Sequence, residues 1–156
     1  ALRQAALAAG LADIAEPDPQ AWLDLIMVEL VEPQLGRGRP TFVTDYPASQ
    51  AALARLRPGD PAVAERFEVF VEGVELANGY HELTDADEQR RRFEADLVAR
   101  RASSLPQPEP DGRLLAALEH GLPDCAGIAL GVDRLVMLAV GTDAIRDVIA
   151  FPIDRA

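Results

Sequence analysis

Hydrophobic and polar positions along the chain repeat with a helical period in some stretches and alternate in others. Helical spacing predicts a short helix over residues 2–9 and a second helix that Asp18 caps and Pro33 ends. Trp22 shares one face of the second helix with further apolar residues, so we expect this face to pack in the core. The alternating stretches predict strands over residues 41–46, 66–71, 74–83, 125–131 and 148–151.

Turn and cap residues divide the remaining chain. Glu72-Gly73 is predicted to join two of the strands as a hairpin. Thr84 is predicted to cap a long helix that ends near Ser103, and Asp111 a shorter one that ends at Gly121. Another helix is expected over residues 133–140, while residues 58–61 form a turn and residues 106–110 a linker. Together these elements predict an α+β fold with a largely antiparallel sheet flanked by helices.

Composition narrows the classes of function. The chain carries 26 acidic and 15 basic residues, a formal net charge of -11, which does not favour tRNA or an anionic membrane as a partner. Its single cysteine excludes an internal disulfide, fits a reducing cytoplasm, and is expected in the core. No apolar run approaches the roughly 20 residues of a membrane span, so we expect a cytoplasmic protein.

The hairpin carries the first candidate chemistry. Alternation places Asn78, Tyr80 and Glu82 on one strand face, where an amide, a ring and a carboxylate suit a small cationic ligand. Glu68 lies on the preceding strand, and Glu75 reaches the same site only if a bulge interrupts the alternation near Asn78. Crowded carboxylates suit Mg²⁺ with a nucleotide phosphate, although a solvated acidic face fits the spacing as well. His81 points the opposite way and is predicted to be structural or exposed.

The segment around residues 127–134 carries the second candidate chemistry. Gly127, Ala129 and Gly131 leave small side chains on one strand face, against which a flat ring or a phosphate can lie. Arg134 lies in the first turn of the following helix, where the helix dipole disfavours a cation. A contact to nucleotide phosphate or base explains it, and a salt bridge to a neighbouring acid explains it equally well.

Two segments resemble the class II aminoacyl-tRNA synthetases of the lysyl branch. Residues 75–85 are similar to the substrate strand of that family, and residues 127–134 to its third signature motif. Further segments resemble the lysyl-tRNA synthetase paralogues that modify elongation factor P, namely residues 40–43, 46–51, 121–127 and 148–156.

This resemblance implies roles for the candidate residues. Glu68 and Glu75 would hold Mg²⁺ that bridges the phosphates of ATP, and Arg134 would contact ATP beside Gly131. The residues implied for the amino-acid pocket are Asn78, Tyr80, Glu82, Gly127 and Ala129. The implied reaction forms an aminoacyl-adenylate from ATP and then transfers an (R)-β-lysyl group to a lysine of elongation factor P. The synthetases have glycine where this chain has Ala129, which favours β-lysine over α-lysine as the substrate.

The first and second motifs of the family have no counterpart in this sequence. Residues 1–156 are therefore expected to form the C-terminal part of a catalytic domain, inactive alone, with apolar surface exposed and a homodimer in the complete protein. Two alternatives stay open: the C-terminal fragment of a lysyl-tRNA synthetase, and a non-catalytic synthetase-like binding module. The second is disfavoured because Glu68, Glu75, Glu82 and Arg134 are all present.

Overall fold

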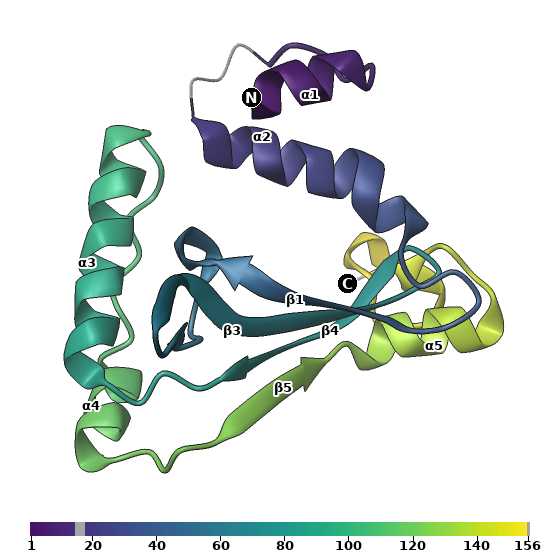
Figure 1. The fold of residues 1–156 in the computed structure, drawn as a ribbon. Coiled ribbons are helices and arrows are strands. Elements are labelled where there is room, and N and C mark those ends of the chain that lie inside the picture. The colour runs from purple at the N-terminus through teal and green to yellow at the C-terminus, as the bar shows by residue number, and fades with distance from the viewer. Residues whose placement is uncertain (15–17, 156) are drawn as a thin grey trace. The chain divides into compact units, whose positions relative to one another are not determined.

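The computed structural model of the protein describes residues 1–14 and 18–155 (Figure 1). Its α-helices are α1 (Leu2–Ala8), α2 (Pro19–Ile26), α3 (Ala86–Ala102), α4 (Gly112–His120) and α5 (Val132–Val140). Its strands are β1 (Thr41–Pro47), β2 (Leu56–Arg57), β3 (Asp60–Val71), β4 (Val74–His81) and β5 (Ala126–Leu130). The sheet has the order β1-β3-β4-β5, and β2 pairs antiparallel with β3. The mostly antiparallel sheet and the helices confirm the predicted α+β class.

The chain divides into two compact units whose boundaries fall within the strands. Unit 1 comprises Ala1–Val43, Glu68–Asn78 and Leu130–Ala156, and unit 2 comprises Thr44–Phe67 and Gly79–Ala129. Each unit contains its own part of the candidate chemistry.

The core of unit 1 forms where the N-terminal helices and the β3–β4 hairpin bury their apolar residues. Asp18 caps α2 as predicted, and its side chain accepts a hydrogen bond from the amide of Gln20 at 2.9 Å. Trp22 on that helix is only 2% exposed, which confirms its core role. Beyond Ile26 the helix continues as a π-helical turn (Met27–Val31) and a 3₁₀ turn (Glu32–Gln34), so it does not end as one regular α-helix.

The turn of the hairpin is the predicted Glu72-Gly73 pair. Both residues have positive φ, 50° and 79°, as the tight turns that suit twisted strands require. The Glu72 carboxylate accepts hydrogen bonds from the amide of Gly38 at 2.7 Å and from the Arg37 guanidinium at 3.3 Å. These contacts fix the turn against the preceding loop.

Unit 2 contains the long helix α3, which lies beside α4 (Figure 1). Arg90 joins the two helices through Glu119 at 2.5 Å and also pairs with Asp87 at 2.7 Å. The predicted cap of α3 is wrong by one residue, because Asp85, not Thr84, accepts hydrogen bonds from the amides of residues 87 and 88. Arg91 and Arg92 both contact Glu88 on their own helix.

Three further predictions about elements differ from the structure. Strand β3 begins at Asp60, six residues before the predicted start, because the turn after β2 is shorter than expected. Within the described residues, 148–151 do not form a strand, and Phe151 is 82% exposed. Strand β5 is not buried, since Ile128 is 60% exposed, and Cys125 before it is only half-buried.

Candidate functional site

The predicted site residues fall into two clusters, one in each unit. The Glu75 cluster lies in unit 1 and consists of Glu68, Glu75, Asn78, Gly131 and Arg134. The Glu82 cluster lies in unit 2 and consists of Tyr80, Glu82, Gly127 and Ala129. Each cluster is described by itself.

Arg134 binds the β4 strand directly. Its Nη1 donates to the main-chain oxygen of Glu75 at 2.7 Å and to the Glu75 carboxylate at 3.3 Å. Gly131, the N-cap of α5, donates its amide to the main-chain oxygen of Leu76 at 2.8 Å. The start of α5 is thus anchored to β4 beside Glu75, so two segments 59 residues apart meet at one place. The Arg134 side chain remains 48% exposed, which leaves its guanidinium accessible to a ligand.

The strand departs from regular alternation at Glu75. The Asn78 amide lies 3.4 Å from the Glu75 carboxylate, although residues three apart on a regular strand face opposite sides. Leu76 and Ala77 are both buried, which is also inconsistent with strict alternation. These observations agree with the predicted bulge, without which Glu75 and Asn78 would face opposite sides of the strand.

A third carboxylate, which is not among the predicted site residues, belongs with this cluster. Glu32 follows the π-helical turn, and the pKa of its carboxyl is raised by burial and by the negative charges of Glu68 and Glu75. Glu68 itself is 9% exposed. The cluster therefore concentrates negative charge in a partly desolvated place, which favours a cation. No periodicity or motif in the sequence marks Glu32, because only the fold brings the 3₁₀ turn to the hairpin.

The donor set of the Glu75 cluster can be tested against Mg²⁺. Among residues 1–14 and 18–155, no group of three or more His, Cys, Asp or Glu side chains is placed to hold a metal ion. Mg²⁺ commonly takes one or two carboxylates and completes its shell with phosphate and water oxygens. Glu68 and Glu75 fit that mode of binding, and they do not form a closed protein cage for the metal.

In unit 2, Glu82 and Gly127 are in direct contact. A Cβ atom built on Gly127 would lie 2.2 Å from the Glu82 carboxylate oxygen, so only glycine leaves room for this position of the carboxylate. The main chain joins the same two strands, because the Glu82 amide donates to the oxygen of Cys125 at 3.0 Å. Ala129 lies further along β5 and is exposed.

Tyr80 lies beside an arginine that is not among the predicted site residues. The Arg66 guanidinium is 4.5 Å from the centre of the Tyr46 ring and 6.0 Å from that of Tyr80. It also donates to the main-chain oxygen of Gln50 at 2.6 Å. Arg66 lies two residues before Glu68 on the same strand. Because alternate residues of a strand share a face, the sequence could have predicted that Arg66 lies on the same face as Glu68.

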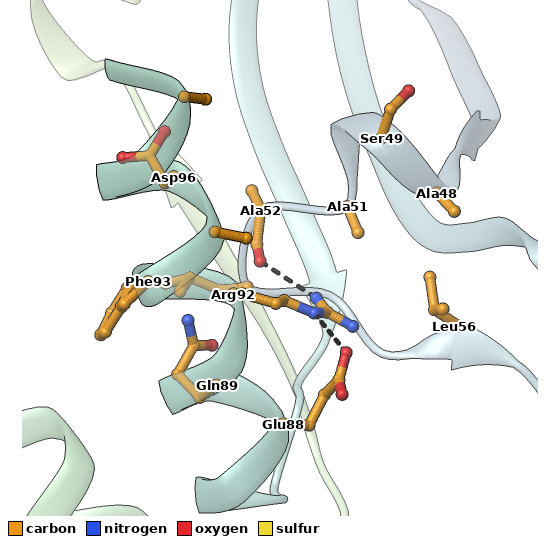
Figure 2. A pocket seen from close by; sticks show the side chains of 13 residues that line it. Ala48, Ser49, Ala51, Ala52, Leu56, Glu88, Gln89, Arg92, Phe93 and Asp96 are labelled. Carbon is orange, nitrogen blue, oxygen red and sulfur yellow. Dashed lines mark hydrogen bonds and ion pairs between the residues drawn. The ribbon is translucent and has the colours of Figure 1, made fainter. Parts of the chain in front are cut away.

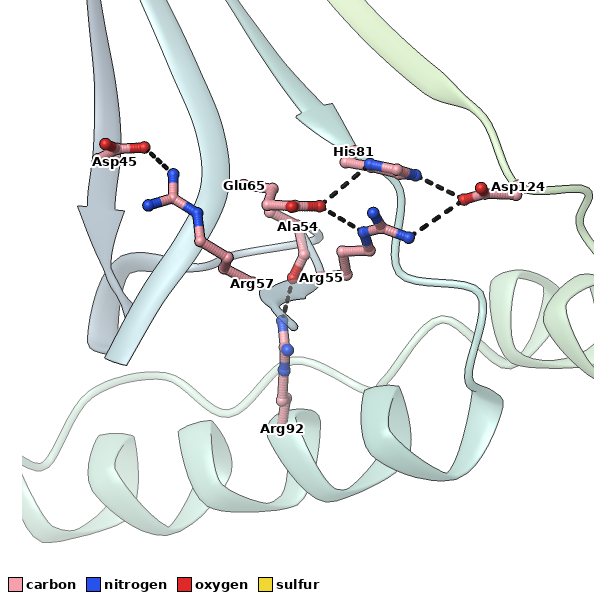
Figure 3. Close-up of polar contacts among 8 residues, drawn as sticks. All are labelled: Asp45, Ala54, Arg55, Arg57, Glu65, His81, Arg92 and Asp124. Atoms are coloured by element: carbon pink, nitrogen blue, oxygen red, sulfur yellow. Dashed lines mark hydrogen bonds and ion pairs between the residues drawn. The ribbon is translucent and has the colours of Figure 1, made fainter. Parts of the chain in front are cut away.

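The opposite face of the same strands carries a polar network. His81 lies between two carboxylates, with Nδ1 at 3.0 Å from Glu65 and Nε2 at 2.5 Å from Asp124 (Figure 3). Arg55 also contacts both acids. We call Arg55, Glu65, His81 and Asp124 the His81 network. These contacts agree with the prediction that His81 is structural or exposed, since its side chain joins two acids and is 29% exposed.

Unit 2 also contains a cavity of about 600 Å³ between residues 48–56 and α3 (Figure 2). Small apolar side chains line much of it, and Arg92 contributes its guanidinium. That guanidinium donates to the main-chain oxygens of Ala52 and Ala54 at 3.1 and 2.7 Å and pairs with Glu88. None of the predicted site residues lines the cavity, so it does not mark the candidate chemistry.

Comparison with known proteins identifies the family. Residues 12–155 match the family model described as "tRNA synthetases class II (D, K and N)". The chain belongs to this family. Proteins named "Elongation factor P--(R)-beta-lysine ligase" are 57% identical in Klebsiella pneumoniae subsp. pneumoniae and 55% identical in both Pectobacterium carotovorum subsp. carotovorum and Yersinia enterocolitica. Each alignment covers 99% of this chain and 48% of the relative.

These findings confirm the resemblance to class II synthetases and to the paralogues that modify elongation factor P. The chain spans about half the length of the curated relatives it matches. Within residues 1–14 and 18–155, no helix is both long and apolar enough to cross a lipid bilayer.

Proposed function

We propose that this chain supplies the ATP-binding and amino-acid-binding residues of a ligase that acts on elongation factor P. In the proposed reaction, a carboxylate oxygen of (R)-β-lysine attacks the α-phosphorus of ATP and releases pyrophosphate. A lysine ε-amine of elongation factor P then attacks the carbonyl of the adenylate and releases AMP and a proton. The observation that carries the proposal is the 55–57% identity to ligases of that name along 99% of the chain.

The Glu75 cluster is proposed to bind ATP. Bound Mg²⁺ would supply positive charge to the phosphate oxygens. Glu68 and Glu75 would offer carboxylate oxygens to it, and Arg134 would turn from the Glu75 carboxylate towards phosphate. The half-exposed guanidinium permits that turn, while its hydrogen bond to the main-chain oxygen of Glu75 keeps the arginine at the strand. Gly131 would leave the strand end open to the nucleotide.

The Glu82 cluster is proposed to bind the amino acid. Glu82 would accept hydrogen bonds from the side-chain ammonium of the substrate, and Tyr80 would cover its methylene stem. Gly127 supports this role, because a residue without a side chain leaves room for the Glu82 carboxylate at this position. Ala129, with a methyl group where the synthetases have none, would favour β-lysine over α-lysine.

The test is ATP–pyrophosphate exchange by the complete polypeptide that contains this sequence. We expect exchange that depends on (R)-β-lysine and Mg²⁺, and that falls by at least about 100-fold in Glu75→Gln and in Arg134→Ala, as expected when a charge-stabilising group is removed. Glu119→Gln is the matched control, because this exposed glutamate of α4 pairs with Arg90 of α3, outside both clusters. Full exchange in both cluster variants would refute the assigned residues.

Different outcomes favour different enzymes. Exchange with α-lysine as good as with β-lysine, together with charging of tRNA, would indicate a lysyl-tRNA synthetase. Absence of ATP binding in calorimetry with Mg²⁺ would indicate a non-catalytic module. For the ligase we expect a homodimer, which light scattering of the complete polypeptide measures.

A further inference from the structure

The His81 network is a closed set of contacts that joins four segments of unit 2. Glu65 comes from β3, His81 ends β4, Asp124 precedes β5, and Arg55 lies before β2 (Figure 3). The imidazole bridges Glu65 and Asp124, and the guanidinium of Arg55 bridges the same two acids. Each of the two bases therefore contacts both acids.

Main-chain hydrogen bonds run through the same place and hold the neighbouring Glu82. The oxygen of His81 accepts from the amide of Arg55 at 2.9 Å, and the amide of Glu82 donates to the oxygen of Cys125 at 3.0 Å. The backbone around Glu82 is thus hydrogen-bonded to Arg55 through the oxygen of His81 and to Cys125 through its own amide. Each of these two hydrogen bonds lies in or next to the His81 network. Because successive side chains on a strand face opposite sides, the network lies behind Glu82 and leaves its carboxylate free to face Gly127.

Each ring nitrogen of His81 lies within hydrogen-bond reach of one acid, and Arg55 contacts the same two acids. The hydrogen bond and charge of His81 hold the pKa of Asp124 below its usual range, and Arg55 followed by His81 lowers the pKa of Glu65. The side chains of Arg55, Glu65 and His81 are 33%, 22% and 29% exposed, so water screens the contacts among these three less than it screens fully exposed pairs, whereas Asp124 is 75% exposed.

We infer that His81 is a positioning residue, which fixes the backbone of Glu82 so that its carboxylate lies over Gly127 and receives the substrate ammonium. This inference rests on the proposed function of Glu82. A substrate-binding carboxylate that moves by about 1 Å can cost up to about 100-fold in catalysis. The network lies on the far side of the strand, so its loss affects the amino acid without removing any group that contacts it.

The first test is steady-state pyrophosphate exchange by the complete polypeptide carrying His81→Gln, Asp124→Asn or both. We expect KM for (R)-β-lysine to rise about 10-fold in each single variant, with KM for ATP and kcat within about twofold of wild type. The double variant is expected to show little further loss, because both changes break one link. The control is Asp45→Asn, which removes a carboxylate from an ion pair with Arg57 in the same unit. An unchanged amino-acid KM in active His81→Gln enzyme would overturn the inference.

The second test does not require activity. Hydrogen exchange of the Glu82 amide in the complete polypeptide is expected to accelerate about 10-fold or more in His81→Gln, and not in Asp45→Asn. Unchanged protection would overturn the inference even if the enzyme proves inactive. Absence of exchange activity in wild type, with a loosened Glu82 amide in the variant, would instead refute the proposed function alone. If His81→Gln does not fold, Asp124→Asn gives the same readout, since the Asp124 side chain is 75% exposed and its loss leaves packing intact.

Discussion

Replacement of Gly127 by alanine separates amino-acid binding from folding. The added Cβ would lie 2.2 Å from the Glu82 carboxylate oxygen, which is far closer than any stable contact. The atom that has to move is the end of a flexible side chain and not a backbone atom. Gly127 has no positive φ that would strain an alanine, so the backbone tolerates the change.

The size of the effect follows from the required movement. To reach an ordinary contact of about 3.4 Å, the carboxylate oxygen has to shift by about 1.2 Å. Misplacement by about 1 Å of a group that orients a substrate can cost about 100-fold. We therefore expect the amino-acid KM to rise by about 100-fold. Stability is expected to stay within about 1 kcal/mol of wild type, because an alanine with suitable φ lowers the entropy of the unfolded chain.

Pyrophosphate exchange at varied (R)-β-lysine and varied ATP measures this effect, and thermal unfolding measures stability. The matched control is Gly112→Ala at the first residue of α4, where a Cβ atom meets nothing within 4 Å. The control is expected to leave both KM values unchanged. If Gly127→Ala retains the wild-type KM for the amino acid and a normal melting temperature, Glu82 does not bind the substrate from its present position.

Three further variants test the packing, the helix cap and the crowded carboxylates. Gly79→Ala would place a Cβ atom 2.4 Å from the Phe67 ring and 2.8 Å from a main-chain oxygen, so it should destabilise the protein by about 1–3 kcal/mol in denaturant unfolding. Asp85→Ala removes the α3 cap. The hydrogen bond that Asp85 accepts from the amide of Glu88 lowers the pKa of Asp85. The drop in melting temperature caused by the substitution should therefore be full above about pH 4 and vanish as the pH falls through the lowered pKa. Burial and two neighbouring glutamates raise the pKa of Glu32, so its charge opposes folding once the pH exceeds that pKa. Glu32→Gln should accordingly raise the melting temperature at pH 7 without divalent cations, and an unchanged value would contradict the crowding.

Local chemistry accounts for the elements that the sequence predicted correctly. The Asp18 cap, the Glu72-Gly73 turn and the end of α4 at Gly121 each depend on one residue type that satisfies the backbone nearby. The same reasoning failed at the start of α3, where either of two neighbouring residues could cap the helix. Thr84 and Asp85 are both good caps, and the sequence contains nothing that decides which of them has the extended conformation that a cap requires.

Burial could not be predicted in the same way, because it depends on what packs against a strand. The apolar residues of β5 predicted a buried strand, yet Ile128 and Leu130 are 60% and 51% exposed. Apolar composition gives a strand the capacity to be buried and does not provide its neighbour. The predicted strand at residues 148–151 is wrong for a related reason, since β propensity without a pairing partner forms no ladder.

The candidate site shows how far alternation reaches. Alternation alone placed Asn78, Tyr80 and Glu82 on one face, and the need for Glu75 to join them predicted an irregularity that the 3.4 Å contact between Glu75 and Asn78 supports. The contact between Arg134 and Glu75 left two readings open, a salt bridge or a ligand contact. The structure contains the salt bridge, but the shorter contact goes to the main-chain oxygen of Glu75 at 2.7 Å, against 3.3 Å to the carboxylate. An arginine that also contacts the backbone keeps its place when its carboxylate partner is drawn to a cation, so the observed salt bridge is compatible with the proposed contact to ATP.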